Sequence, residues 1–256
     1  MGEPLVEVRA ATRPQGPARR HGRTFFVAMS TILGVAVLVG FARTLYLRPF
    51  LGLPEMPVHL YVHGAVLTAW FFLLLMQVVL VRSDRTRVHR RLGLYGAVLA
   101  VAVVAISLLT VALRDVGFID EAPFRGFGNV MSVVGFSICV GFAVLLRHRP
   151  AAHKRLMLLG SILITGPALD RMAQLPTVAE FLAPILPDAL GSTGVAFATL
   201  ATPSLMLAVV GYDVVTRKRP HSATLGGMAG IFFLAPAITA ALIYSGLWSA
   251  FVRFVG

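Results

Sequence analysis

The sequence predicts an all-α integral membrane bundle of seven transmembrane helices. The chain of 256 residues is 57% hydrophobic and only 13% charged, whereas a soluble domain carries about 25% charged residues. The mean hydropathy is +0.81. The apolar residues fall in long runs, and a run of roughly 20 residues crosses the hydrocarbon core as a helix. Because the runs are continuous rather than alternating, they favour helices over a β-barrel.

The apolar runs divide the chain into a tail and one membrane domain. Residues 1–23 are too long and too mixed in composition for the charged region of a signal peptide, and no cleavage site follows the first run. We therefore expect a flexible basic tail over 1–23 and a transmembrane domain over 24–256. Its seven helices are predicted at residues 24–46, 60–81, 92–113, 128–146, 156–175, 193–213 and 225–248.

The basic residues indicate how the helices are oriented. Of the 23 Lys and Arg residues, 17 lie in the tail or in the loops after the second, fourth and sixth predicted helices. The positive-inside bias then predicts a cytoplasmic N-terminus and an outside C-terminus. The net charge of +12 is explained by this distribution, which argues against a nucleic-acid partner and suits anionic lipid headgroups.

Several residues predict departures from straight helices. Pro167, Pro203 and Pro236 fall inside the fifth, sixth and seventh helices, where each removes a backbone hydrogen bond and should cause a kink. Residues 176–191 combine apolar side chains with prolines, which predicts a short segment lying on the outer leaflet. Small residues four apart predict close helix contacts at Ala36/Gly40, Ser161/Thr165 and Gly226/Gly230.

Histidines recur beside basic residues immediately before alternate helices, at His21, His89, His153 and His221. The length of a membrane hairpin alone explains this interval. His89 and His153 would lie at one depth on parallel helices, where two imidazoles can be axial ligands of one haem b iron. Together with His221 and Asp213, they could instead hold a transition metal. The alternative is that these histidines only occupy the headgroup region. His21 borders the tail and is not a candidate.

A second group of ionisable residues is expected near the outer ends of the helices: Arg43, His59, His63, Asp170 and Arg171. At about 1.5 Å per residue, their distances from the inner ends place them near the outer edge of the core. His59 and His63 share a helix face, so with Asp170 they could form a two-histidine, one-carboxylate metal site. The alternative is a buried Asp170–Arg43 ion pair with interfacial histidines.

Missing motifs narrow the range of functions. The seventh helix contains no lysine, which argues against a retinal Schiff base, and the chain lacks a P-loop, G-x-S-x-G, C-x-x-C and C-x-x-C-H. Few charges lie in the middle of the predicted spans, which disfavours an ion-coupled transporter. Gln77 in the second helix is expected to form hydrogen bonds between helices.

Three strings carry a resemblance to a known family: HGAVLTAWFFLLLMQ (63–77), HRRLG (89–93) and RHRPAAHKRLM (147–157). They resemble uncharacterised bacterial multi-pass inner-membrane proteins, a domain-of-unknown-function family with H-G…W…Q and H-R-x-L-G motifs. The Tyr212–Asp213 pair and the following H-x-A-T string at His221 also match. The resemblance implies a bacterial inner-membrane location and no established activity.

The histidine positions are also loosely similar to those of cytochrome b561-like and haem A synthase-like proteins, which bind haem through histidines at helix ends. This chain departs from them because no second helix offers an outer histidine. Our leading prediction is a redox or cofactor-handling membrane protein that binds haem or a metal ion. The alternatives are a non-catalytic subunit or assembly factor of a larger membrane complex, and a small-molecule or lipid carrier. Expected partners are membrane lipids and a larger complex or homo-oligomer.

Overall fold

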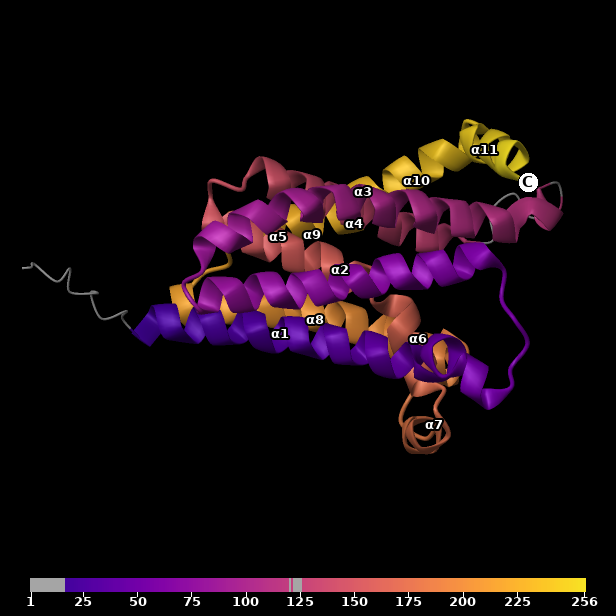
Figure 1. Ribbon diagram of the computed structural model, residues 1–256, viewed down its shortest axis with the longest axis horizontal. Helices are drawn as coiled ribbons and strands as arrows, with labels where there is room; N and C mark the ends of the chain where they lie inside the picture. The colour runs from indigo at the N-terminus through magenta and orange to yellow at the C-terminus, as the bar shows by residue number, and fades with distance from the viewer. Residues whose placement is uncertain (1–16, 120, 122–125) are drawn as a thin grey trace, which may run out of the picture.

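The chain folds as a bundle of roughly parallel and antiparallel helices. The computed structural model describes residues 17–119, 121 and 126–256, and this part of the chain contains no strands. Figure 1 shows the long helices side by side, with their ends gathered at the two ends of the bundle. The bundle is built from α1 (Pro17–Phe41), α2 (Val58–Arg82), α3 (Thr86–Asp115), α4 (Phe127–Leu145), α5 (Pro150–Leu163), α6 (Gly166–Ala173), α8 (Thr193–Arg217), α9 (Ser222–Ala229) and α10 (Ala235–Tyr244).

These helices have the length and composition of membrane spans, which confirms the predicted fold class. Among the described residues, six segments are long and apolar enough to cross a membrane, and α5 with α6 makes a seventh if the bent pair is one span. Large apolar side chains cover the outside of the bundle, with Phe72 70% and Leu94 71% exposed. Such a surface suits hydrocarbon, because lipid removes the need to bury apolar groups.

Short turns explain why consecutive helices run antiparallel. Ser83–Arg85 joins α2 to α3, and Asp84 adopts a left-handed conformation there (φ 59°). Pro150 opens α5, where its missing N–H would have no helical partner in any case. Such turns bring three Arg-rich loops to one end of the bundle, which we call the basic end. It comprises residues 82–91, 147–155 and 217–221.

The fifth predicted helix is broken rather than merely kinked. α5 ends at Leu163, and α6 begins at Gly166 with Pro167 in its first turn, at an angle of 46°. The break brings α6 against α1, where a Cβ on Gly40 would lie only 2.2 Å from the Ala168 carbonyl oxygen. The predicted close contact at Ala36/Gly40 is therefore present.

The seventh predicted helix differs most from expectation. A π-helical turn, η5 (Gly230–Leu234), separates α9 from α10, and Pro236 lies in the first turn of α10. Proline has no N–H to donate, so the series of helical backbone hydrogen bonds is interrupted just before Pro236. The span ends at Tyr244, whereas the sequence predicts a seventh helix that continues to residue 248. Gly246, in a left-handed conformation (φ 74°), precedes a further helix, α11 (Leu247–Val255).

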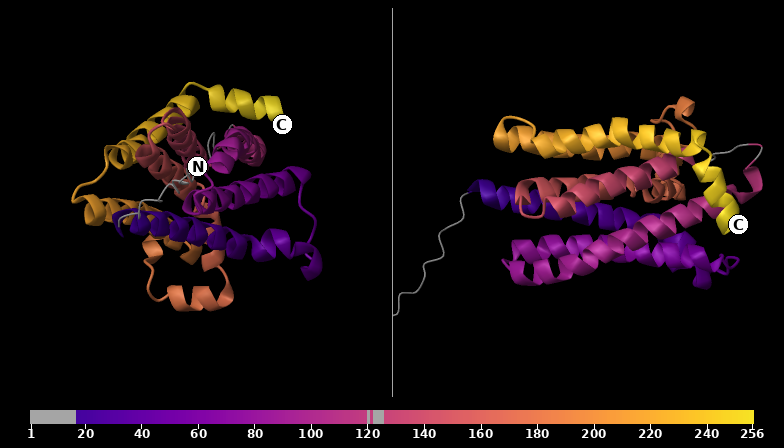
Figure 2. Two further views of the ribbon diagram at one scale, coloured as in Figure 1. Left: turned by 60° about the vertical axis from the view of Figure 1, so that its left-hand side comes forward. Right: turned by 90° about the horizontal axis from the view of Figure 1, so that it is seen from above.

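Short elements occupy the end opposite the basic end. They are η1 (Ala42–Tyr46), η2 (Arg48–Leu51), η3 (Val116–Phe118), α7 (Pro176–Leu182) and η4 (Asp188–Leu190). Figure 2 shows α7 to one side of the bundle, and Phe181 on it is 69% exposed. The segment predicted at 176–191 thus does form its own short helix, and its position on a lipid leaflet stays a prediction.

The core joins the helices through tight apolar contacts and through buried hydrogen bonds of two tryptophans. The Trp70 ring meets Phe136 edge to face at 5.0 Å, and its indole N–H donates to Ser161 Oγ at 3.1 Å. A smaller cluster fixes α11, where the Trp248 indole N–H donates to Asp115 Oδ2 at 3.2 Å. Of the predicted tail, residues 1–16 lie outside the described part of the chain, and the backbone of α1 starts at Pro17.

Candidate functional site at the basic end

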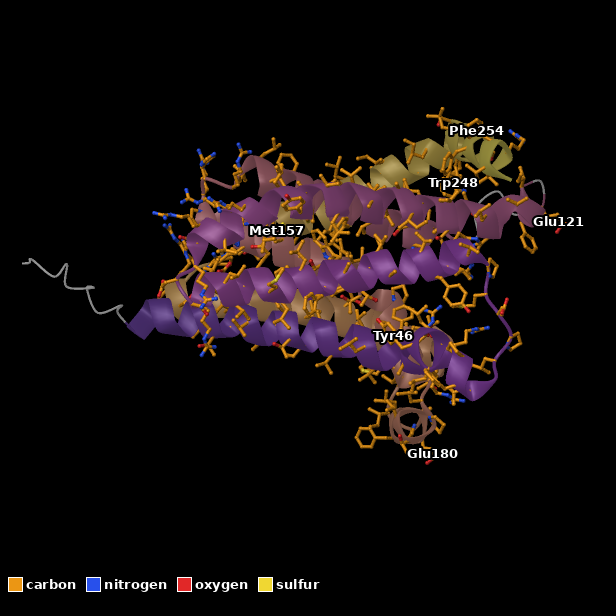
Figure 3. The ribbon with its side chains drawn as sticks, in the orientation of Figure 1. Tyr46, Glu121, Met157, Glu180, Trp248 and Phe254 are labelled. Carbon is orange, nitrogen blue, oxygen red and sulfur yellow. The ribbon has the colours of Figure 1, made fainter. Side chains whose placement is uncertain are left out.

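The basic end brings together polar side chains from five helices. Figure 3 shows nitrogen-bearing side chains concentrated there, around the starts of α3 and α5 and the end of α8. The arrangement has two parts. One is a pair of histidines, His89 and His153, and the other is a buried set of hydrogen bonds around Asp213.

The histidine pair is formed by the first turns of α3 and α5. The ring centres of His89 and His153 lie 6.3 Å apart, and the rings are nearly perpendicular at 84°. α3 and α5 both pack on α4 more than on each other. The two side chains therefore reach toward one another between backbones that are not in close contact.

A backbone carbonyl holds the His153 ring in a defined state. His153 Nδ1 lies 2.8 Å from the Ala143 carbonyl oxygen of α4. Because a carbonyl can only accept, Nδ1 carries a proton, and in the neutral ring Nε2 then keeps the lone pair that a metal requires. A hydrogen bond of this kind orients the histidines that bind metals in proteins.

Gln77 of α2 holds the His89 ring. With its amide turned to match its neighbours, the nitrogen donates to His89 Nδ1 (2.5 Å) and to the His89 carbonyl (3.2 Å), and the oxygen accepts from the Gly93 N–H (3.2 Å). His89 then carries its proton on Nε2. Gln77 thus bonds between helices as predicted, and the partner it holds is one of the candidate histidines.

Asp213 is the centre of a buried polar network that links α5, α8 and α9. Arg155 is 2% and Asp213 0% exposed. The Arg155 Nε donates to Asp213 Oδ1 at 2.8 Å, and one terminal guanidinium nitrogen donates to the same oxygen. The other carboxylate oxygen, Oδ2, accepts from Thr224 Oγ1 (2.5 Å) and the His221 N–H (3.0 Å). We call these four residues the Asp213 network.

His221 caps α9 instead of facing the histidine pair. Its Nδ1 accepts from the Ala223 N–H at 3.0 Å, and so this nitrogen must be unprotonated. Burial, followed by the nearby charges of Arg155 and Arg217, lowers the pKa of His221 from its ordinary value of 6.5. His221 is thus a structural neighbour of Asp213, and the grouping of His89, His153, His221 and Asp213 around one metal is not formed.

Aromatic rings cover the network from the α1 side. The Lys154 ammonium lies 4.4 Å from the Phe26 ring centre, and the Arg155 guanidinium lies 5.7 Å from that of Tyr212. Phe25 stacks on Tyr212 at 4.3 Å. These contacts keep water from the ion pair and tie α1 to the basic end.

The opposite end does not form the predicted metal site. In the part of the chain that the structure describes, no three His, Cys, Asp or Glu side chains are placed to hold a metal ion. The predicted set of His59, His63 and Asp170 is therefore not assembled. Asp170 instead accepts from the Gln174 amide at 2.9 Å. The reason is the break between α5 and α6, which changes the direction of the helix that carries Asp170.

The alternative Asp170–Arg43 ion pair is not formed either. Arg43 is exposed on the π-helical turn η1, and among the described residues the ion pair found inside the bundle is Arg155–Asp213. Arg171 lies with its guanidinium 4.9 Å from the Phe41 ring centre and donates to the Pro167 carbonyl at 3.1 Å. His63 keeps a buried Nδ1 that has no hydrogen-bond partner.

Sequence reasoning missed Arg155 and Thr224 as functional candidates. Arg155 lies in a basic loop between the fourth and fifth predicted helices, and the sequence analysis uses such loops only to orient the helices in the membrane. A signal was present, because Asp213 is a lone acid at a basic helix end, and a buried acid there requires a cationic partner. The side chain of His21 lies outside the part of the chain that the structure describes.

No protein-family model, curated protein or solved structure matches this chain. The resemblance to uncharacterised inner-membrane proteins therefore stays a prediction, and the function is inferred from the geometry of the chain itself.

Proposed function

We propose that this chain is a multi-pass protein of the bacterial inner membrane that handles a redox cofactor, with His89 and His153 binding one haem iron or transition-metal ion. The supporting observation is the separation of 6.3 Å between the two ring centres. A metal–nitrogen bond is about 2.0–2.1 Å long, so two imidazoles on opposite sides of one metal have ring centres about 6 Å apart. The perpendicular rings are compatible with this, because each can rotate about its metal–nitrogen bond.

The orientation of the Gln77 amide decides whether His89 Nε2 is available to bind the metal. In the amide orientation that matches its neighbours, the Gln77 nitrogen donates to His89 Nδ1, which leaves the proton on Nε2. If the amide turns over, its oxygen accepts from Nδ1–H, and Nε2 becomes available as a ligand. This is the state that His153 already has through the Ala143 carbonyl. Metal or haem binding is therefore expected to be coupled to the orientation of Gln77 and to move the His89 proton from Nε2 to Nδ1, with the ring neutral in both states.

An absorption spectrum tests the haem form of the proposal. The protein is expressed with added haem precursor and purified in mild detergent. We expect a Soret band in the wild type and its loss in His89→Ala and in His153→Ala. His148→Ala is the matched control, because His148 is an exposed histidine at the same end of the bundle and should leave the band unchanged.

Elemental analysis of the same samples tests the metal form. A stoichiometric transition metal that is lost in both histidine variants and kept in His148→Ala would support an ion in place of haem. Folded wild-type protein with neither a Soret band nor a stoichiometric metal would overturn the proposal. Retention of the cofactor in the His89→Ala/His153→Ala double variant would also overturn it, because the ligands would then lie elsewhere.

Gln77→Glu and Gln77→Leu separate ligand orientation from simple packing. A carboxylate at this position can only accept from Nδ1–H of His89, so it favours the ligand state of Nε2. We expect tighter retention of the cofactor in Gln77→Glu and weaker retention in Gln77→Leu. Equal losses in both variants would mean that Gln77 serves only helix packing.

A further inference from the structure

A groove opens on the outer surface of the bundle between α4 and the α9–α10 segment. Its empty volume is about 1080 Å³, counted with the space at its open side. α4, α5, α9 and α10 lie next to one another in Figure 1. One wall extends from Ala223 to Ala237, and the other includes Cys139, Phe142 and Leu146.

Glycines create the depth of the groove. A Cβ on Gly226 would meet nothing within 4 Å, so this residue faces open space. Gly227 forms the floor, because a Cβ there would lie 2.8 Å from Leu159 and 2.9 Å from Leu156. The π-helical turn η5 lies along the same wall and turns Phe233 outward, where it is 76% exposed.

The lining is that of a hydrocarbon site. It contains no charged side chain, and its one polar group is the Cys139 thiol, which lies 3.9 Å from the Gly227 carbonyl. Its wall extends from Ala223 to Ala237, which corresponds to about 21 Å of helix at 1.5 Å per residue. An extended acyl chain of a membrane lipid has a similar length.

The end of the groove lies between two basic loops. Leu146 is followed by Arg147, His148 and Arg149, and Ala223 is preceded by Arg217, Lys218 and Arg219. Neither loop contains Asp or Glu, and the nearby Asp213 is already paired with Arg155. A basic cluster between helices at this depth attracts anionic headgroups.

We propose that the groove binds one anionic phospholipid, with an acyl chain along the glycine wall and its phosphate between the 147–149 and 217–219 loops. The charge of these loops also argues against a second copy of this chain as the occupant. Two copies that share one membrane orientation would bring identical cationic loops to the same depth, where they would repel one another.

Filling the groove tests where the acyl chain lies. Gly226→Leu adds a side chain where nothing lies within 4 Å, and Gly211→Leu on α8 is the matched control, because Gly211 is also exposed and has nothing within 4 Å. Native mass spectrometry is recorded from micelles containing equal amounts of phosphatidylglycerol and phosphatidylcholine. We expect one retained phosphatidylglycerol in the wild type and in Gly211→Leu, and about tenfold less in Gly226→Leu, since two excluded methylenes suffice for this loss.

Removing charge tests the headgroup independently of the groove. Arg147→Gln/Arg219→Gln should abolish the preference for phosphatidylglycerol over phosphatidylcholine, whereas Arg253→Gln, an exposed charge on α11, should not. Equal retention of both lipids by the wild type would overturn the proposal. Unchanged lipid retention in folded Gly226→Leu, or a wild-type dimer that Gly226→Leu dissociates, would overturn it as well. None of these readings depends on haem or metal content, so failure here leaves the histidine proposal unaffected.

Discussion

At the scale of single residues, the most deeply buried charges at the basic end are paired with one another. Arg155 and Asp213 are almost completely buried, yet the carboxylate accepts from Arg155, Thr224 and the His221 backbone. An isolated charge would be very costly at this depth. The Asp213 network therefore holds the ends of α5, α8 and α9 together only as long as it is complete.

Removing one partner of the ion pair should be more damaging than removing both. Asp213→Leu leaves the Arg155 guanidinium buried without its acid, and we expect a loss of about 3–5 kcal/mol in the free energy of unfolding. The double variant Arg155→Met/Asp213→Leu should recover a large part of this loss. Thermal unfolding in detergent measures both, with Arg90→Met, an exposed residue at the same end, as control. A double variant as unstable as the sum of the single ones would contradict this account.

His221 should make the stability of the basic end depend on pH. Its folded pKa lies below 6.5, so its neutral form contributes stability that is complete above pH 6.5 and is lost as the pH falls through the lowered folded pKa. The reason is the α9 cap, since a protonated Nδ1 cannot accept from the Ala223 N–H.

His221→Asn provides the comparison for this pH dependence. Asparagine keeps an acceptor for the cap but does not titrate in this range. Unfolding temperatures measured from pH 7.5 to 5 should fall more steeply for the wild type than for His221→Asn. Parallel curves would assign the acid sensitivity to other groups.

At the scale of elements, each departure from a straight span has a local cause. Pro167 opens α6 after the break that follows α5, and Pro236 follows the π-helical turn η5. Pro203, by contrast, lies inside α8, which continues from Thr193 to Arg217. The prolines were visible in the sequence, but whether a helix breaks at one depends on which neighbours satisfy the freed carbonyls.

The break between α5 and α6 makes Gly40 a sensitive position. A Cβ on Gly40 would lie 2.2 Å from the Ala168 carbonyl oxygen, so Gly40→Ala must push α1 and α6 apart. We expect a loss of about 1–3 kcal/mol in unfolding free energy. Gly34→Ala on the same helix is the control, because nothing lies within 4 Å of its Cβ position. It should be neutral or slightly stabilising, since alanine favours helix over glycine.

A Gly40→Ala variant as stable as Gly34→Ala would show that α6 can move away from α1 without cost. Thermal unfolding of both variants in the same detergent decides the matter.

At the scale of the whole molecule, the bundle has one basic end, and its orientation in the membrane is the prediction that follows. Basic loops are retained on the cytoplasmic side during insertion. A cysteine placed in the α2–α3 turn should therefore react from the cytoplasmic side, and one placed between α10 and α11 from the opposite side.

Ser83→Cys and Ser245→Cys test this orientation, since both positions are exposed. The native Cys139 is buried and should not react with a membrane-impermeant maleimide in intact cells. We expect labelling of Ser245→Cys in intact cells and of Ser83→Cys only after the membrane is opened. The reverse pattern would place the basic end outside.

The sequence by itself determined the class of fold and the positions of the long apolar helices. Long apolar runs allow few structures in a membrane, because backbone groups in hydrocarbon must bond within their own segment. The same patterning indicated which histidines begin parallel helices, and hence that His89 and His153 could meet. It also offered Asp213 as a candidate metal ligand, without indicating that Arg155 is its partner.

Only the tertiary structure decided which of these residues meet. Depth along a helix can be counted from the sequence, but the rotation of each helix and the direction after a break cannot. For this reason Asp170, which was predicted at the depth of His63, lies on α6 beyond a bend of 46° and forms no metal site with it. Arg155, which the sequence placed in a basic loop, instead faces Asp213. The lining of the groove beside Gly226 likewise comes from five helical segments, whose contacts depend on packing rather than on local sequence.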